Sequence, residues 1–361
     1  MAHSRDAAEL ALPGRWYRPI EGESANGAAG VFQVGHTGYH RPMFSYRHAF
    51  HAGNHADVLK HAVLIATLQH LTEKDAALTV VDTHSGAGLY RLDGDYASTS
   101  GEAADGVLKL FSKQKEALAP ATPAQDAPKK GANDVPDVFA GGLAPLLQDY
   151  LGVVQSFNGG KALKVYPGSP FITQHLMRPH DRLKLFELHP TDSRTLTANI
   201  AQLEAGRQVM VFGTDGFEGV KKFIPPPARR ALVLCDPSYE MKDDYARVAA
   251  MVADGLKRFA TGTYAVWYPI IPRPEAHDLP RKLKTLAQKA GKSWLHATLT
   301  IKSSKLTKDD AGDTVRPGLP ASGMFLVNPP FTLKPALAIA LPQLVALLGQ
   351  DRHASFSLEA G

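Results

Sequence analysis

The chain has 361 residues, of which 44% are hydrophobic and 21% charged, a balance typical of a folded globular protein of one or two domains. It contains no run of about 18 apolar residues, which argues against a membrane span. Its one cysteine, Cys235, excludes an internal disulfide and favours the reducing cytoplasm. The net charge of +5 is compatible with a phosphate-rich partner but does not identify one.

Composition divides the chain into segments. The Gly- and Ala-rich residues before Met43 contain few apolar runs, and whether Met43 is the native start stays open. We predict a flexible N-terminal extension at 1–42, a main domain formed by 43–92 and 166–345, a helical insertion at 93–165, and a C-terminal tail at 346–361.

Strands and helices alternate through the main domain. A helix is predicted over 54–71, where apolar residues recur at helical spacing and Asn54 or Asp57 can cap the start. Strands are predicted at 78–88, 182–190, 207–220, 231–239, 262–271, 296–302 and 322–330, with helices at 191–204, 244–259 and 275–290. This order predicts a doubly wound, Rossmann-like α/β fold with a seven-stranded, mostly parallel sheet.

The insertion at 93–165 is much longer than an ordinary crossover. Its central part, "KQKEALAPATPAQDAPKKGANDVPD", is rich in Ala, Pro and Lys, and we expect it to be flexible. The flanking stretches near 100–112 and 142–157 have helical patterns. We therefore predict an inserted helical subdomain.

A Gly-rich turn, "DTHSGAG", follows the first predicted strand. Gly86 and Gly88 allow a tight turn and a close approach to a nucleotide-type cofactor, although an ordinary strand-to-helix turn is the alternative. The dinucleotide pattern fails because Arg91 stands where its third glycine belongs. The acid that ends a strand is Glu187, beyond the insertion.

Acidic residues end the next three strands. Glu187 ends the second, Asp215-Gly216 the third and Asp236-Pro237 the fourth. This order resembles the S-adenosylmethionine-dependent amino-methyltransferases. The resemblance implies that Glu187 holds the ribose hydroxyls and that Asp215 accepts from the adenine amino group of the cofactor.

The fourth-strand motif of those enzymes is Asp/Asn/Ser-Pro-Pro-aromatic, and this chain reads Asp236-Pro237-Ser238-Tyr239. An exocyclic adenine amine is a poor nucleophile because its lone pair is delocalised into the ring. Asp236 and the Pro237 carbonyl would accept its hydrogens as the bond to methyl forms. Tyr239 would stack on a base turned out of its helix, and Ser238 departs from the motif.

Two other features compete with this assignment. The stretch "NPPF" at 328–331 matches the motif, but it follows the last strand, so we interpret Asn328 as part of a strand-ending turn. Cys235 precedes Asp236 inside the strand, and an inert buried thiol is favoured over a covalent nucleophile.

The stretch "SYRHAFHAGNHADVLKH" is rich in histidine. His51 and His55 have the spacing of metal ligands on a helix, but no cysteine joins them and Gly53-Asn54 interrupts the helix. We predict no metal site. The alternatives are a polar cap beside cofactor or nucleic acid, with Arg47 and Lys60 facing phosphate or carboxylate, or a surface helix start.

The motifs together give a more specific resemblance. "SYRHAFHAGNHADVLKH", "DTHSGAGLY", "YPGSP", "ELHP", "DGF", "DPSYEMKDDY", "KRFATGTYAVWYPI" and "ASGMFLVNPP", in this order over 43–345, resemble the ribosomal RNA large subunit methyltransferase J family. The resemblance implies N6-methylation of one adenine in 23S rRNA with S-adenosylmethionine.

The same resemblance implies roles for individual residues. The cofactor would be bound by Lys60, His61, His84, Gly86, Gly88, Ser169, Glu187, Asp215, Gly216 and Asp236. Asp236, Pro237 and Tyr239 would form the catalytic motif, and Tyr46, Arg47, Lys60 and Tyr239 would contact the RNA or form a lid.

Two other functions stay open on the residues alone. One is a DNA adenine-N6 methyltransferase, although only 218–230 lies where such enzymes often carry a target-reading domain. The other is a non-catalytic RNA-binding protein on a methyltransferase fold, which Ser238 alone favours. We expect a monomer that acts on free 23S rRNA or an early assembly particle, away from membranes.

Overall fold

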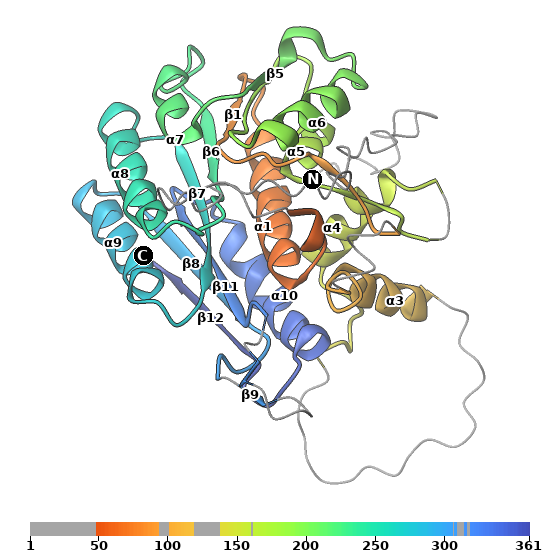
Figure 1. The fold of residues 1–361 in the computed structure, drawn as a ribbon. Helices are drawn as coiled ribbons and strands as arrows, with labels where there is room; N and C mark the ends of the chain where they lie inside the picture. Colours follow the sequence, from red (N-terminus) through yellow and green to blue (C-terminus); the bar gives the residue numbers. More distant parts are fainter. Residues whose placement is uncertain are drawn as a thin grey trace, which may run out of the picture.

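The computed structural model describes residues 48–93, 101–118, 138–159, 162–305, 307–308, 314–315 and 318–361. Their centre is an eight-stranded sheet with the order β12-β8-β11-β7-β6-β1-β4-β5 (Figure 1). Its strands are β1 (Thr79–Asp82), β4 (Arg182–Phe186), β5 (Val209–Phe212), β6 (Ala231–Cys235), β7 (Thr263–Ile270), β8 (Trp294–Thr300), β11 (Ala321–Val327) and β12 (Ser355–Ala360).

Strand directions divide this sheet into two parts. The neighbours β7, β6, β1, β4 and β5 are parallel, whereas β11 is antiparallel to β7 and β8, and β12 is antiparallel to β8. The α/β fold class is confirmed, but the predicted strand count was one too low. The tail predicted at 346–361 is wrong, because this segment contains the end of a helix and all of β12.

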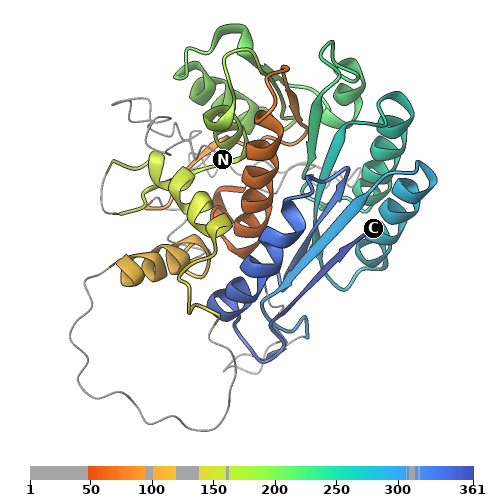
Figure 2. The same cartoon turned by 180° about the vertical axis from the view of Figure 1, so that it is seen from behind.

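Helices cover both faces of the sheet (Figures 1 and 2). One apolar core joins the sheet to α1 (His55–Thr72), α4 (Pro145–Ser156), α5 (Ser169–Leu176) and α10 (Leu333–Leu348). A second core joins the opposite face to α8 (Asp243–Arg258) and α9 (Pro274–Lys289). The remaining helices are α3 (Val107–Leu118), α6 (Pro190–Ala201), α7 (Gly216–Gly219), η2 (His48–Phe50), η3 (Gly206–Gln208) and η4 (Val220–Lys222).

α1 is an unusually buried helix. Every residue from His55 to Ile65 is buried, because α1 lies between the sheet and α4, α5 and α10. Asn54 caps its start, and its side-chain oxygen accepts from the backbone N–H groups of Ala56 and Asp57 at 2.9 and 3.0 Å. α1 therefore carries ionisable side chains into the interior. None of the helices in the described parts of the chain is long and apolar enough to cross a membrane.

The described parts of the insertion pack into the main core. The short strands β2 (Leu89–Arg91) and β3 (Val165–Pro167) pair with each other where the insertion leaves and returns. α4 contacts α1 and α10. Gly106 lies so close to the start of α1 that an added Cβ would stand 2.0 Å from the Gly53 carbonyl oxygen.

Residues 1–42 and most of the Ala/Pro-rich stretch lie outside the described residues. Along the chain, β8 and β11 are separated by two short strands that pair with each other, β9 (Thr307–Lys308) and β10 (Thr314–Val315).

Candidate active site

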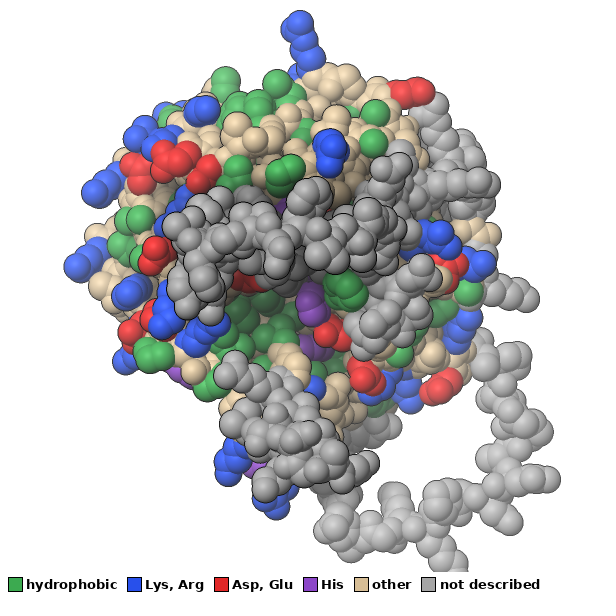
Figure 3. Space-filling model, in the orientation of Figure 1, with side chains coloured by type: hydrophobic (Ala, Val, Ile, Leu, Met, Phe, Trp, Pro, Cys, Tyr) green, Lys and Arg blue, Asp and Glu red, His purple; other side chains and the backbone are tan. Residues whose placement is uncertain are grey.

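A cavity of about 380 Å³ opens at the carboxyl ends of β1, β4, β5 and β6. Histidine side chains lie near the centre of this face, whereas acidic and basic side chains are intermixed around its margins (Figure 3). The predicted site residues that line the cavity are Lys60, His61, His84, Gly86, Ser169, Glu187, Asp215, Gly216, Asp236 and Pro237. Its volume lies within the range of small-molecule sites.

The cavity lies where the strand order reverses. From β1 the chain crosses to β4 and then β5 on one side, and then to β6 and β7 on the other. Open α/β sheets bind ligands in the crevice outside the carboxyl ends of the strands at such a point. The topology therefore supports a cofactor site here.

Glu187 and the Gly-rich turn form one wall. The Gly86 N–H donates to Glu187 Oε2 at 2.7 Å, and the His189 N–H donates to Oε1 at 2.8 Å. Gly86 has a φ of +58°, and a Cβ there would stand 2.3 Å from the Tyr90 hydroxyl. Burial raises the pKa of Glu187 to about 7, although both backbone bonds oppose this rise. The carboxylate oxygens keep lone pairs for hydroxyl donors.

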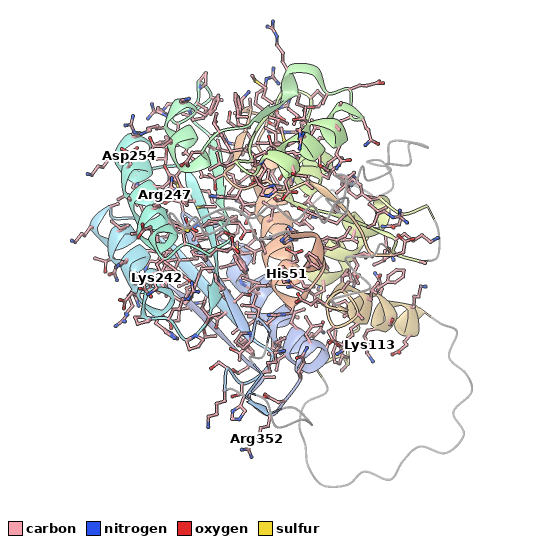
Figure 4. All side chains as sticks on the ribbon, in the orientation of Figure 1. His51, Lys113, Lys242, Arg247, Asp254 and Arg352 are labelled. Atoms are coloured by element: carbon pink, nitrogen blue, oxygen red, sulfur yellow. The ribbon has the colours of Figure 1, made fainter. Side chains whose placement is uncertain are left out.

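Asp215 forms a second wall at the start of α7. Its Oδ1 accepts from the Phe217 N–H at 2.9 Å, and its Oδ2 forms an ion pair with Arg247. Arg247 extends from α8 (Figure 4). Its guanidinium lies 4.3 Å from the Phe217 ring centre. Gly216 approaches Thr83 so closely that a Cβ would stand 2.0 Å from the Thr83 carbonyl oxygen.

His84 is a neutral member of the lining. Burial lowers its pKa to about 3. Thr83 Oγ1 donates to the Leu234 carbonyl at 3.1 Å and lies 2.8 Å from His84 Nδ1. In a neutral imidazole one ring nitrogen donates and the other accepts, so His84 brings one acceptor nitrogen to this part of the site.

Ser169 is held by Asp82, an acid that is not among the predicted site residues. Its hydroxyl donates to Asp82 Oδ2 at 2.6 Å. Burial raises the pKa of Asp82 to about 6, although the bond from Ser169 opposes this rise. Asp82 ends β1 directly before the Gly-rich turn, and this position was the available signal in the sequence.

Lys60 joins the buried carboxylate of Asp57 to the half-buried carboxylate of Asp236. Its Nζ lies 2.5 Å from Asp236 Oδ2 and 2.9 Å from Asp57 Oδ1, and His48 Nε2 lies 2.9 Å from Asp57 Oδ2. Burial opposes the charge on Lys60, but the two carboxylates outweigh it and raise the pKa of Lys60. Burial also opposes the Asp57 carboxylate, but His48 and Lys60 hold the pKa of Asp57 well below its usual range. His48 and Asp57 were not among the predicted site residues.

His61 lies beside Lys60 on α1. Its Nδ1 is 2.7 Å from the Tyr166 hydroxyl, which lies 3.1 Å from the Tyr150 hydroxyl. Burial lowers the pKa of His61 to about 3, so the ring is neutral. Its Nε2 finds no hydrogen-bond partner among the described residues.

Two predicted site residues do not line the cavity. Tyr239 is only 2% exposed, and its hydroxyl donates to the Trp267 carbonyl at 2.6 Å, so the predicted stacking on a base does not match its position. Gly88, with a φ of +82°, faces Leu196 and Phe171 and serves the turn and its packing. Tyr46 and Arg47 lie outside the described residues.

The competing residues lie away from the cavity. Asn328 has a φ of +53°, and its amide donates to the Ala260 and Gly262 carbonyls at 2.9 and 2.7 Å, as expected for a strand-ending turn. Cys235 is fully buried in the core on the α8 side, and burial raises the pKa of its thiol.

Comparisons with known proteins agree with this geometry. Residues 75–123 and 138–359 match the family model described as ribosomal RNA large subunit methyltransferase D, RlmJ. Two proteins named ribosomal RNA large subunit methyltransferase J are each 37% identical. The Escherichia coli protein matches over 84% of this chain and 93% of its own length, and the Haemophilus influenzae protein over 88% and 98%.

A solved structure gives the same result at the level of the fold. A Legionella pneumophila protein is 28% identical, with a TM-score of 0.67 over 86% of this chain and 98% of its own. The extent of these matches and the arrangement of the cavity lead to one conclusion: the chain belongs to the RlmJ family of ribosomal RNA large subunit methyltransferases.

Proposed function

We propose that the protein methylates the N6 amino group of an adenine in 23S rRNA, acting in the cytoplasm as a monomer on free rRNA or an early assembly particle. The observation that carries this proposal is the position of Asp236. Its carboxylate ends β6 in the same cavity as Glu187 and Asp215, and Lys60 holds it from α1. The names of the relatives support rRNA as the substrate class.

S-adenosylmethionine, the cofactor of this methyltransferase family, supplies an electrophilic methyl group as a sulfonium. The cavity fits it on the chemistry of its donors and acceptors. Glu187 offers acceptors for ribose hydroxyls, Asp215 and the neutral His84 offer acceptors for an amino group, and Gly86 lets the backbone approach closely. Leu188 lines the cavity and is 49% exposed, so it offers an apolar contact for a purine ring.

Asp236 would act on the target base. Its carboxylate accepts an N–H of the adenine amine and removes a proton as the nitrogen becomes cationic. Lys60 fixes Oδ2 with a 2.5 Å contact, so the geometry of the acceptor is set before the substrate arrives. The surrounding burial strengthens this charge arrangement because little water screens it.

The test is transfer of labelled methyl from S-adenosylmethionine to protein-free 23S rRNA, with duplex DNA in parallel and the product nucleoside identified. We expect N6-methyladenosine in the rRNA alone. Asp236→Ala should lower the rate at least about a hundredfold while binding of S-adenosylhomocysteine changes little. Asp254→Ala is the matched control, because Asp254 lies on α8 (Figure 4), pairs with Arg258 at 2.6 Å and does not line the cavity.

Methylation of DNA alone would overturn this proposal and favour a DNA adenine-N6 methyltransferase. A wild-type rate in Asp236→Ala would remove Asp236 from catalysis. Cofactor binding without transfer to either nucleic acid would favour the non-catalytic alternative.

A further inference from the structure

We propose that Tyr239 and Arg273 are positioning residues, which hold the loop after β6 so that Asp236 faces the target base. The inference rests on the proposed function, since it assigns a role around Asp236. It also gives the aromatic residue of the motif a different task from stacking on the base.

The first observation is the conformation of the loop. Tyr239 has a φ of +55°, a left-handed conformation that is strained for a bulky side chain. Its neighbours Pro237, Ser238, Glu240 and Met241 line the cavity, whereas Tyr239 does not. The strained residue therefore turns its ring into the core while the backbone on either side faces the cavity.

The second observation is that two hydrogen bonds hold this residue. The Tyr239 hydroxyl donates to the Trp267 carbonyl on β7 at 2.6 Å. Arg273 Nη1, from the residue that precedes α9, donates to the Tyr239 carbonyl at 3.1 Å. The Tyr239 ring also lies 4.6 Å from the Tyr245 ring on α8. A strained conformation persists where the surroundings fix it in this way.

β7 is a rigid support for these contacts. It is parallel to β6, and Cys235 pairs in register with Val266, so Trp267 lies beside the point where the loop begins. A shift of Tyr239 would consequently move Asp236 relative to Lys60. Small displacements of a reacting group lower rates strongly.

Ser238 makes the two bonds more important. A proline at this position would fix its own φ, whereas serine leaves that angle free. In this chain the loop therefore depends on side-chain bonds for a rigidity that its backbone does not supply.

The experiment compares Arg273→Ala, Tyr239→Phe and the control Arg281→Ala, using 23S rRNA and S-adenosylmethionine. Arg281 lies on α9, is well exposed and pairs with Asp278, so its loss changes the charge equally without touching the loop. We expect kcat to fall about tenfold or more in the first two variants, the size of one lost hydrogen bond to a charged or buried group. KM and the affinity for S-adenosylhomocysteine should change less than about threefold.

A second arm separates positioning from general loss of structure. Arg273→Ala is made again in the Ser238→Pro background, and the fold-loss in kcat is measured there. We expect the loss to shrink to about threefold or less, because the proline restores the rigidity that Arg273 provided. A merely structural defect would cost the same in both backgrounds.

Three outcomes would overturn the inference. They are an unchanged kcat in both Arg273→Ala and Tyr239→Phe, an equal fall in kcat in Arg281→Ala, or an equal loss in the two backgrounds. Failure of the proposed function is a different result, because it appears as full activity in Asp236→Ala or as transfer to another substrate.

Discussion

Lys60 Nζ lies 2.5 Å from Asp236 Oδ2, although 176 residues separate them in the chain. The contact joins α1 to the loop that follows β6, and both residues line the cavity. Both partners are largely buried, with side-chain exposures of 6% and 15%. The same ammonium also faces Asp57, so one cation balances two carboxylates.

Lys60→Met should destabilise the fold and abolish most of the activity. Removing one partner of a buried ion pair leaves uncompensated charge, which costs about 3–5 kcal/mol of unfolding free energy. We expect urea denaturation to show a loss of this size and methyl transfer to fall about a hundredfold. A loss below about 1 kcal/mol would contradict this account of the buried charges.

Asp57→Asn provides the matched test of the network. In Lys60→Met the carboxylates of Asp57 and Asp236 lose their cation. Adding Asp57→Asn removes one of these two uncompensated charges, so the losses in unfolding free energy should be less than additive. The rate should stay low, because Asp236 still lacks its cation. Strictly additive losses would show that Asp57 and Lys60 do not interact.

The affinity for cofactor should depend on pH through Glu187. Its pKa of about 7 means that the carboxylate takes up a proton as pH falls below 7, and a protonated group offers ribose hydroxyls fewer acceptors. We expect the Kd of S-adenosylhomocysteine, measured by calorimetry, to increase as pH falls below 7, with a limiting slope of about tenfold per pH unit. Glu187→Gln should remove this dependence, whereas the exposed Glu218→Gln should keep it.

The stability of the free protein has the opposite trend. The folded-state pKa of Glu187 lies above its ordinary value of 4.5, so between these values the folded state binds more protons than the unfolded state. The contribution of Glu187 therefore makes the fold more stable as pH falls from about 8 to 5. The difference in unfolding free energy between the wild type and Glu187→Gln, measured across this pH range, gives the contribution of Glu187.

Two glycines of the insertion should respond in opposite ways to alanine. Gly106→Ala places a Cβ 2.0 Å from the Gly53 carbonyl oxygen, so it should destabilise the fold by about 2 kcal/mol or more. Gly152 lies exposed inside α4 with open space around it, so Gly152→Ala should add roughly 0.5–1 kcal/mol. Equal effects would mean that the insertion does not depend on this close packing.

Cys235 should be dispensable for the chemistry. The thiol is buried and its pKa is raised, so little thiolate forms at neutral pH. Cys235→Ala should keep the methyl transfer rate within about twofold, and iodoacetamide should label the native protein only after unfolding. Loss of transfer in a folded variant would revive a covalent mechanism.

The sequence predicts the parallel part of the sheet well because its strands are short, largely apolar runs that lead into an acid or a turn. In β6 every residue from Ala231 to Cys235 is buried, and the acid that follows such a run lies at the carboxyl edge. It missed β12 because Ser355–Ala360 is a partly exposed edge strand whose polar residues interrupt any apolar run.

The candidate site was predicted less completely. Motif order located Glu187, Asp215 and Asp236, since each follows a strand of the same parallel set. It did not predict the direction of the Tyr239 side chain, which depends on a left-handed backbone angle and on bonds to β7. The link from His48 to Asp57 is not predicted either, because the sequence indicates Asp57 only as a possible helix cap and its burial depends on the packing around α1.

The reversal of strand order between β1 and β6 separates two tasks that a methyltransferase must perform. On the proposed assignment, residues that follow β1, β4 and β5 hold the methyl donor, whereas Asp236, which follows β6 and is held by Lys60, presents the acceptor. The two groups meet along one ladder, in which Asp82 pairs with Leu234. The ion pair between Arg247 and Asp215 links the two sides, so on this assignment a substitution on the acceptor side that spares this pair can change the target nucleotide while the donor pocket stays intact.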